Sequence, residues 1–147
     1  MKDMILTDEM QKVMDLVKNT DSNVFVTGKA GSGKTTFLKY LIANCGKNCI
    51  VTAPTGVAAI NAGGVTLHSM FGIPFGPITP YDKLENRFSE YKTELLLKLQ
   101  LLIIDEISMV RPDILDTIDR KLRWVCECDE PFGGVQIVMF GNLFQLP

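Results

Sequence analysis

The chain has 147 residues, 46% of them hydrophobic, so it is long enough to bury the core of one domain. Its formal net charge of −2 argues against a strongly basic clamp for nucleic acid but does not exclude a local groove. The sequence contains no apolar run of about eighteen residues that would span a membrane. The first residues also lack the apolar segment of a signal peptide, so we expect a cytoplasmic protein.

The predicted elements begin with a helix over 7–18 and a strand over 23–27. A second helix over 35–44 and a second strand over 49–52 follow. The first helix is indicated by apolar residues that recur at helical spacing, namely Met10, Val13, Met14 and Val17.

Shorter elements are predicted in the middle of the chain. Thr55 suits the N-cap of a short helix that runs to Ile60 and is ended by the glycines at 63–64. Three prolines within 73–82 exclude regular structure and predict a surface loop. An amphipathic helix over 82–99 is expected next.

The second half predicts two strands around one helix. The apolar run 101–104 is typical of a strand covered on both faces, and 135–140 predicts another. Pro112 fits the first turn of the intervening helix, whose apolar stripe is Ile114, Leu115, Ile118, Leu122 and Val125. Strands that alternate with helices predict an α/β fold with a mostly parallel central sheet, in which ligands bind beyond the carboxyl ends of the strands.

The four cysteines form two pairs that are distant in the sequence, Cys45 with Cys49 and Cys126 with Cys128. Neither spacing matches a common zinc motif, and a four-cysteine zinc site would require the two segments to meet in the fold. We therefore favour free thiols, which a reducing compartment maintains.

The segment from Gly28 to Thr35 matches the phosphate-binding loop of nucleoside triphosphatases and lies between a predicted strand and helix, as that loop requires. Its glycines allow backbone N–H groups to approach phosphate. Lys34 would reach the β- and γ-phosphates, and the Thr35 hydroxyl would ligate Mg²⁺. A glycine-rich turn that merely opens a helix does not account for these two residues. The candidate nucleotide-binding residues are Gly28, Ala30, Gly31, Ser32, Gly33, Lys34, Thr35 and Thr36.

Two adjacent carboxylates, Asp105 and Glu106, follow the apolar strand over 101–104. Asp105 can hold Mg²⁺, usually through water, and Glu106 can orient and deprotonate the attacking water. Acids after a core strand are also a common strand-to-loop pattern, so the pair is informative only beside the phosphate loop. Together the two motifs favour hydrolysis of a triphosphate over binding alone.

The chain carries four segments that belong together, at 28–36, 52–60, 102–109 and 140–147. Together they resemble the PIF-type DNA helicases, the RecD-like branch of helicase superfamily 1. Their order and spacing match that family, and Thr-Leu-His-Ser-Met-Phe at 66–71 fits its next DNA-contact segment. The resemblance implies a three-layer, RecA-like domain of the P-loop NTPase type over 1–147, truncated at its C-terminal end. It further implies an ATP-dependent helicase motor that uses Mg-ATP to translocate on single-stranded DNA.

The resemblance implies two further nucleotide contacts. Gln11 resembles the glutamine that hydrogen-bonds adenine, for which an amide is apt because it donates and accepts together. Gln145 resembles the residue that senses the γ-phosphate, which completes a candidate catalytic set with Lys34, Asp105 and Glu106. The alternatives are a solvated helix position for Gln11 and a polar loop residue for Gln145.

The resemblance also implies a DNA-contact segment at Pro54, Thr55 and Gly56, where Thr55 can serve as an N-cap at the same time. His68 lies in the segment that touches DNA sugar or base in the family, against the alternative of a structural histidine. One departure is Asn142, which replaces the family's usual aspartate and loses its charge.

The partners implied by the resemblance are single-stranded DNA and a second RecA-like domain of the same chain, with a monomer as the expected state. That second domain carries arginine fingers, so we expect the isolated chain to hydrolyse ATP very slowly. Two other classes stay open. A ring-forming ATPase loader or remodeller would draw its arginine from a neighbouring subunit, and a nucleotide-gated binding module would show no turnover.

Overall fold

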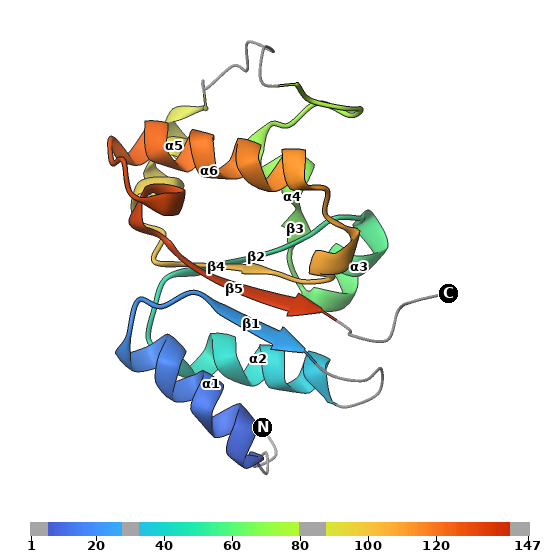
Figure 1. Cartoon of the computed structure of the whole chain (residues 1–147), viewed down its shortest axis with the longest axis vertical. Helices are drawn as coiled ribbons and strands as arrows, with labels where there is room; N and C mark the ends of the chain where they lie inside the picture. The colour runs from blue at the N-terminus through green and yellow to red at the C-terminus, as the bar shows by residue number, and fades with distance from the viewer. Residues whose placement is uncertain (1–5, 28–32, 80–87, 142–147) are drawn as a thin grey trace.

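The computed structural model describes residues 6–27, 33–79 and 88–141. Its centre is a five-stranded sheet with helices on both faces (Figure 1). Every strand pair is parallel, and the order across the sheet is β1-β5-β4-β2-β3. The predicted α/β architecture is confirmed. The strands are β1 (Val24–Thr27), β2 (Cys49–Ala53), β3 (Val65–Thr66), β4 (Leu101–Ile104) and β5 (Gln136–Gly141).

The helices form two layers around this sheet. In Figure 1, α1 and α2 lie below the sheet, whereas α4, α5 and α6 lie above it. The α-helices are α1 (Asp8–Asn19), α2 (Lys34–Asn44), α3 (Gly56–Ala62), α4 (Leu67–Phe71), α5 (Glu90–Leu97) and α6 (Pro112–Cys126). Two short 3₁₀ helices are η1 (Ile107–Met109) and η2 (Pro131–Gly134).

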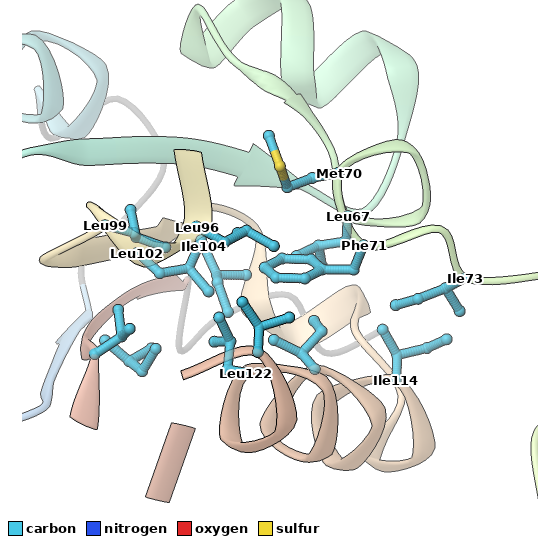
Figure 2. Packing of buried hydrophobic residues seen from close by; sticks show 14 of the residues in the cluster. Leu67, Met70, Phe71, Ile73, Leu96, Leu99, Leu102, Ile104, Ile114 and Leu122 are labelled. Atoms are coloured by element: carbon cyan, nitrogen blue, oxygen red, sulfur yellow. The ribbon is translucent and has the colours of Figure 1, made fainter. Parts of the chain in front are cut away.

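Strand β4 divides the core in two because successive side chains of a strand point to opposite faces. Leu101 and Ile103 pack with the cluster under α1 and α2. Leu102 and Ile104 pack with the cluster of α4, α5 and α6, as Figure 2 shows. All four residues of β4 are buried, as a strand covered on both faces must be.

Local capping signals set most helix ends. The hydroxyls of Thr7, Thr55 and Thr66 accept hydrogen bonds from backbone N–H groups in the first turns of α1, α3 and α4. Gly63 ends α3 in the left-handed conformation, as its position predicted. Pro112 is in the first turn of α6, where its missing N–H leaves no helical bond unmade.

The expected helix over 82–99 is wrong in its extent. Phe88 and Ser89 are not helical, and α5 starts at Glu90, because the Ser89 hydroxyl caps the helix by accepting from the N–H of Lys92. The part of this prediction before Phe88, residues 82–87, lies outside the described residues. In α6, Leu115 is only half-buried, whereas Thr117 and Lys121 are buried.

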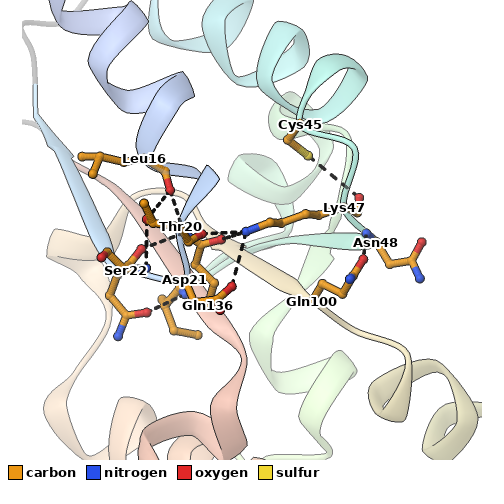
Figure 3. Close-up of polar contacts among 11 residues, drawn as sticks. Leu16, Thr20, Asp21, Ser22, Cys45, Lys47, Asn48, Gln100 and Gln136 are labelled. Carbon is orange, nitrogen blue, oxygen red and sulfur yellow. Dashed lines mark hydrogen bonds and ion pairs between the residues drawn. The ribbon is translucent and has the colours of Figure 1, made fainter. Parts of the chain in front are cut away.

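The amino ends of the strands meet in a polar network around Gln136, which is 1% exposed (Figure 3). Its Nε2 donates to the carbonyl of Ser22 at 2.7 Å, and its Oε1 accepts from Lys47 Nζ at 2.7 Å. Lys47 Nζ also donates to the carbonyl of Thr20 at 2.8 Å. One buried amide therefore ties the segment before β1, the segment before β2 and the start of β5 together.

None of the helices in the described ranges combines the length and apolar character that crossing a membrane requires.

Candidate nucleotide-binding site

Three adjacent strands bring the predicted site residues to one edge of the sheet. Thr27 at the end of β1 pairs with Gly141 at the end of β5, and Ile104 at the end of β4 pairs with Met139. The chain therefore leaves three neighbouring strands at the same edge, and one of these exits is directly followed by Asp105. Predicted residues outside the described ranges are Gly28, Ala30, Gly31, Ser32, Asn142 and Gln145.

The start of α2 fits an anion. Gly33 has a φ of +84°, a left-handed conformation that strains any residue with a Cβ. Lys34, Thr35 and Thr36 form the first turn that follows, with Thr35 and Thr36 exposed. The N–H groups of a first turn have no partner within their own helix, and they carry the positive end of its dipole. The described end of the predicted phosphate loop thus has the geometry that phosphate binding requires.

Lys34 is the described residue whose environment most favours an anion. Its Nζ is buried and, among the residues that the structure describes, has no hydrogen-bond partner. A buried ammonium without partners is costly, so such a group is retained where an anion binds it. The charge of Lys34 also acts on Asp105, where it opposes in small part the rise in pKa that burial causes.

The two carboxylates are held differently. Burial raises the pKa of Asp105 and the charge of Glu106 adds to the rise, whereas the N–H of Glu106 and the charge of Lys34 lower it. Asp105 Oδ1 accepts from the N–H of Glu106 at 2.9 Å, and the N–H of Asp105 donates to the carbonyl of Thr52 at 2.9 Å. Glu106 has a φ of +52°, a strained conformation for a residue with a side chain.

A pocket of about 480 Å³ lies beside Lys34, between α1, β1 and α2. Gln11 is not among its lining residues; it is exposed on α1, and its Nε2 donates to Asp15 Oδ1 at 3.0 Å. A larger hollow of about 740 Å³ between α5 and α6 contains none of the predicted site residues, whereas the smaller pocket contains Lys34. The smaller pocket is lined by Thr7, Glu9, Met10, Val13, Phe25, Val26, Thr27, Lys34 and Phe37.

The predicted DNA-contact residues lie at the ends of β2 and β3. Pro54, Thr55 and Gly56 join β2 to α3, and the Thr55 hydroxyl accepts from the N–H of Ala58 at 3.2 Å. Thr55 is therefore an N-cap, and its DNA role stays a prediction. His68 in α4 stacks on Phe75, with ring centroids 5.1 Å apart and planes inclined by 15°.

Sequence reasoning missed the apolar pocket wall and Phe75. Met10 and Val13 were assigned to the core stripe of a helix, because periodicity cannot distinguish a core face from a pocket wall. The one signal for Phe75 was its place between Pro74 and Pro77, in a loop that can hold an apolar side chain in solvent.

The cysteines are free thiols. Burial raises the pKa of Cys49 to about 11, with the neighbouring Cys45 adding to the rise. Within 6–27, 33–79 and 88–141, no three His, Cys, Asp or Glu side chains gather in a group that could hold a metal ion.

The profile of PIF1-like helicases matches residues 5–147. The chain belongs to the PIF1-like helicase family. The chain is 41% identical over 150 residues to the ATP-dependent DNA helicase RRM3 of Saccharomyces cerevisiae, covering 97% of this chain and 21% of that protein. It is 39% identical over 145 residues to the ATP-dependent DNA helicase PIF1 of Mus musculus, and this match covers 97% of this chain and 22% of that protein.

A solved Pif1 helicase from Bacteroides, in complex with ADP-AlF3 and ssDNA, is 83% identical with a TM-score of 0.92. The match covers 99% of this chain and 34% of that one. The chain therefore spans about a fifth of these curated relatives and a third of this solved helicase. The RecA-like fold expected from the sequence agrees with this PIF1-like helicase structure.

Proposed function

We propose that this chain is the first RecA-like motor domain of an ATP-dependent DNA helicase, which hydrolyses Mg-ATP to move along single-stranded DNA. The observation that carries the proposal is the buried Nζ of Lys34, which acts on the Asp105 carboxyl and has no hydrogen-bond partner among the described residues. A phosphate group would satisfy that ammonium. The family membership supports the same function.

The residues divide the work at the nucleotide. Gly28, Ala30, Gly31, Ser32 and Gly33 would hold the phosphates with backbone N–H groups, followed by Lys34, Thr35 and Thr36 in the first turn of α2. Thr35 and Asp105 would hold Mg²⁺, whose positive charge neutralises phosphate oxygens. Mg²⁺ in such sites needs only one or two protein oxygens besides phosphate and water, so it does not need a cluster of carboxylates.

Glu106 would orient the attacking water and accept its proton. Its backbone is placed by two neighbours: the Asp105 carboxylate accepts from its N–H, and η1 begins immediately after it. Gln145 would sense the γ-phosphate, and an arginine of a second RecA-like domain would stabilise the charge that develops in the transition state.

The base would enter the pocket beside Lys34. The side chains of Met10, Phe25 and Phe37 give this pocket apolar walls suited to the faces of a purine. Gln11 lies one residue beyond Met10 on α1, and it would have to leave Asp15 to pair with the adenine edge. This rearrangement is part of the proposal, because a ligand can replace an exposed amide–carboxylate contact at little cost.

The DNA strand would pass over Pro54, Thr55, Gly56 and His68, with sequence-independent phosphate and stacking contacts. Thr52 connects this segment to the nucleotide site. Its buried hydroxyl donates to the carbonyl of Ile103 at 2.8 Å, and its carbonyl accepts from the N–H of Asp105. A shift of Asp105 or Glu106 on hydrolysis would therefore act on β2, which leads to Pro54.

The chain as a whole would be one domain of a longer, monomeric and cytoplasmic protein. Its span of about a third of the solved Bacteroides relative supports a second RecA-like domain outside these 147 residues. Without that domain's arginine, we expect turnover by the isolated chain to be very slow.

The test is Glu106→Gln in the full-length protein, with ATP hydrolysis measured with and without single-stranded DNA. We expect turnover to fall by about 10²-fold or more while a fluorescent nucleotide binds with unchanged affinity. Glu90→Gln on the exposed start of α5 is the matched control. Unchanged turnover would remove Glu106 from the mechanism.

The two other classes give different results in the wild-type protein. A nucleotide-gated binding module binds ATP without hydrolysis. A ring-forming ATPase assembles into a stable oligomer with ATP, which size-exclusion chromatography detects. A monomer whose hydrolysis is stimulated by DNA supports the helicase motor.

A further inference from the structure

Phe75 is the most exposed large hydrophobic residue in the described part of the chain, with 91% of its surface accessible. Leaving a phenylalanine in water forgoes the free energy of burying its ring, so the fold gains no stability from this side chain. Such a side chain is informative when its backbone is held in place, because the ring then cannot reach the core by a small movement.

The loop that carries Phe75 is held at both ends. Ile73 and Ile78 are buried in the cluster of α4, α5 and α6. Between them, Pro74 and Pro77 restrict the backbone on either side of the ring. The ring is therefore presented to solvent from a loop with two apolar anchors.

The beginning of α6 fixes the same loop through polar contacts. Arg111 Nη2 donates to the carbonyl of Gly76 at 2.8 Å, and Asp113 Oδ2 accepts from the N–H of Ile78 at 3.0 Å. Arg111 and Asp113 also pair directly, with Nε 3.0 Å from Oδ1. The loop around Phe75 is thus held by the two buried isoleucines and by the Arg111–Asp113 pair, which we call the Arg111–Asp113 clamp.

One neighbour of the ring is His68, the histidine of the predicted DNA-contact segment, and the two rings are nearly parallel. Two cationic side chains reach the backbone next to this pair. Lys92 Nζ donates to the carbonyl of Ser69, next to His68, and Arg111 reaches Gly76, next to Phe75. An exposed ring stacked on a second ring, with Lys92 bound to the adjoining backbone, suits single-stranded nucleic acid, whose bases stack and whose phosphates attract cations.

We propose that Phe75, stacked on His68, holds a nucleobase of the bound single strand on its exposed ring. This inference rests on the proposed function for DNA binding and adds a contact outside the four motif segments. The base would stack without readout of its edges, so the contact is independent of sequence. The Arg111–Asp113 clamp would position the ring, and it follows Glu106 by only a few residues, across η1.

The experiment measures the affinity of the full-length protein for a labelled oligo(dT) over a range of salt concentrations. Phe75→Ala should weaken binding by roughly 5- to 100-fold, the range found when a stacking side chain is removed. The dependence on salt should not change, because no phosphate contact is lost. Phe75→Trp should keep the affinity of the wild-type protein.

The matched control is Trp124→Ala, which removes another exposed aromatic ring, 57% accessible, from the hollow between α5 and α6. It should leave DNA affinity unchanged. A series of oligonucleotides with one abasic position supplies the second readout. At one position, loss of the base should weaken the wild-type protein but not Phe75→Ala, because the contact is already absent.

The outcomes separate this inference from the function on which it rests. Failure of the wild-type protein to bind oligo(dT) removes the DNA-binding function itself. Wild-type binding together with equal binding by Phe75→Ala overturns the assignment of Phe75 alone. A Phe75→Ala variant with unchanged DNA affinity but altered thermal stability or oligomeric state would assign the ring to a protein contact. Fluorescent nucleotide binding confirms that each variant is folded.

Discussion

The two edges of the parallel sheet are built in opposite ways. At the amino edge, the polar groups around Gln136 and Lys47 pair with one another and with backbone carbonyls (Figure 3). At the carboxyl edge, Lys34 Nζ is buried without a hydrogen-bond partner in the described ranges, Glu106 has a positive φ, and Phe75 points into solvent. Both edges belong to the same five strands.

The difference separates stability from function. Hydrogen bonds that are complete in the folded chain stabilise it without a ligand. A buried ammonium, a strained backbone and an exposed ring all cost free energy that a ligand can recover on binding. We therefore expect substitutions at the carboxyl edge to lower activity with little effect on stability. Substitutions at the amino edge should lower stability with little effect on activity.

The largest expected effect is at Lys34. Lys34→Ala should lower ATP turnover by the full-length protein about 10²- to 10³-fold, since a donor to the developing charge is lost. Its thermal stability should not fall, because the side chain that is removed carries a buried ammonium with no hydrogen-bond partner among the described residues. Lys39→Ala, at an exposed position of α2, is the control. A marked loss of stability in Lys34→Ala would contradict the contrast between the edges.

At the opposite edge, Gln136→Ala should destabilise the fold by about 2–3 kcal/mol, because the Ser22 carbonyl loses its donor and Lys47 Nζ loses its buried acceptor, keeping only the Thr20 carbonyl and Asp21. Urea unfolding measures the loss. Gln100→Ala removes an exposed amide at the same edge, which accepts from the N–H of Asn48, and should cost less than about 1 kcal/mol. An equal loss of unfolding free energy in the two variants would mean that burial does not make the Gln136 hydrogen bonds more stabilising than an exposed one.

Thr52→Val tests a residue with a contact that stabilises the fold and a contact to the candidate nucleotide site. The substitution keeps the shape and removes the hydrogen bond to the Ile103 carbonyl, which should cost about 1–2 kcal/mol. Valine keeps the backbone carbonyl that accepts from the N–H of Asp105, so the variant tests the hydroxyl alone. If the bond between the hydroxyl and the Ile103 carbonyl also couples β2 to β4, DNA should stimulate ATP hydrolysis less in the variant while nucleotide affinity stays the same. Stability and stimulation are measured on one preparation, and a loss of stability alone would restrict Thr52 to a structural role.

The smallest effect is expected for Asp105→Asn. Burial raises the pKa of Asp105 in the folded chain above its ordinary value of 3.8. At a pH between the ordinary pKa and the raised one, the folded chain therefore keeps a proton that the unfolded chain has lost. Stability contributed by this group therefore falls as pH rises through that window and stays lower above it. Asp105→Asn should raise the melting temperature slightly at pH 7 without nucleotide, and the gain should shrink as pH approaches 4. A gain that grows on acidification would contradict the assigned direction.

Much of the nucleotide site follows from local signals. The phosphate loop needs glycines, lysine and threonine at set spacing between a strand and a helix, and an apolar run before Asp105 can only be a buried strand in such a fold. Parallel strands then place their carboxyl ends together. The caps at Thr7, Thr55 and Pro112 are equally local, since each acts within one turn of its own helix.

Long-range contacts decided the rest. Whether Gln136 is solvated or buried depends on Ser22 and Lys47, which are distant in the chain, and no local pattern encodes that meeting. The late start of α5 is the exception, because the Ser89 cap is a local contact that the periodicity of 82–99 did not reveal. Phe75 meets His68 only because buried isoleucines and the Arg111–Asp113 pair fold its loop back onto α4. The sequence by itself thus determined the order of the elements and the chemistry at the strand ends, through interactions within a few residues. The tertiary structure decided which side chains are buried, paired or presented, because those states depend on contacts between segments far apart in the chain.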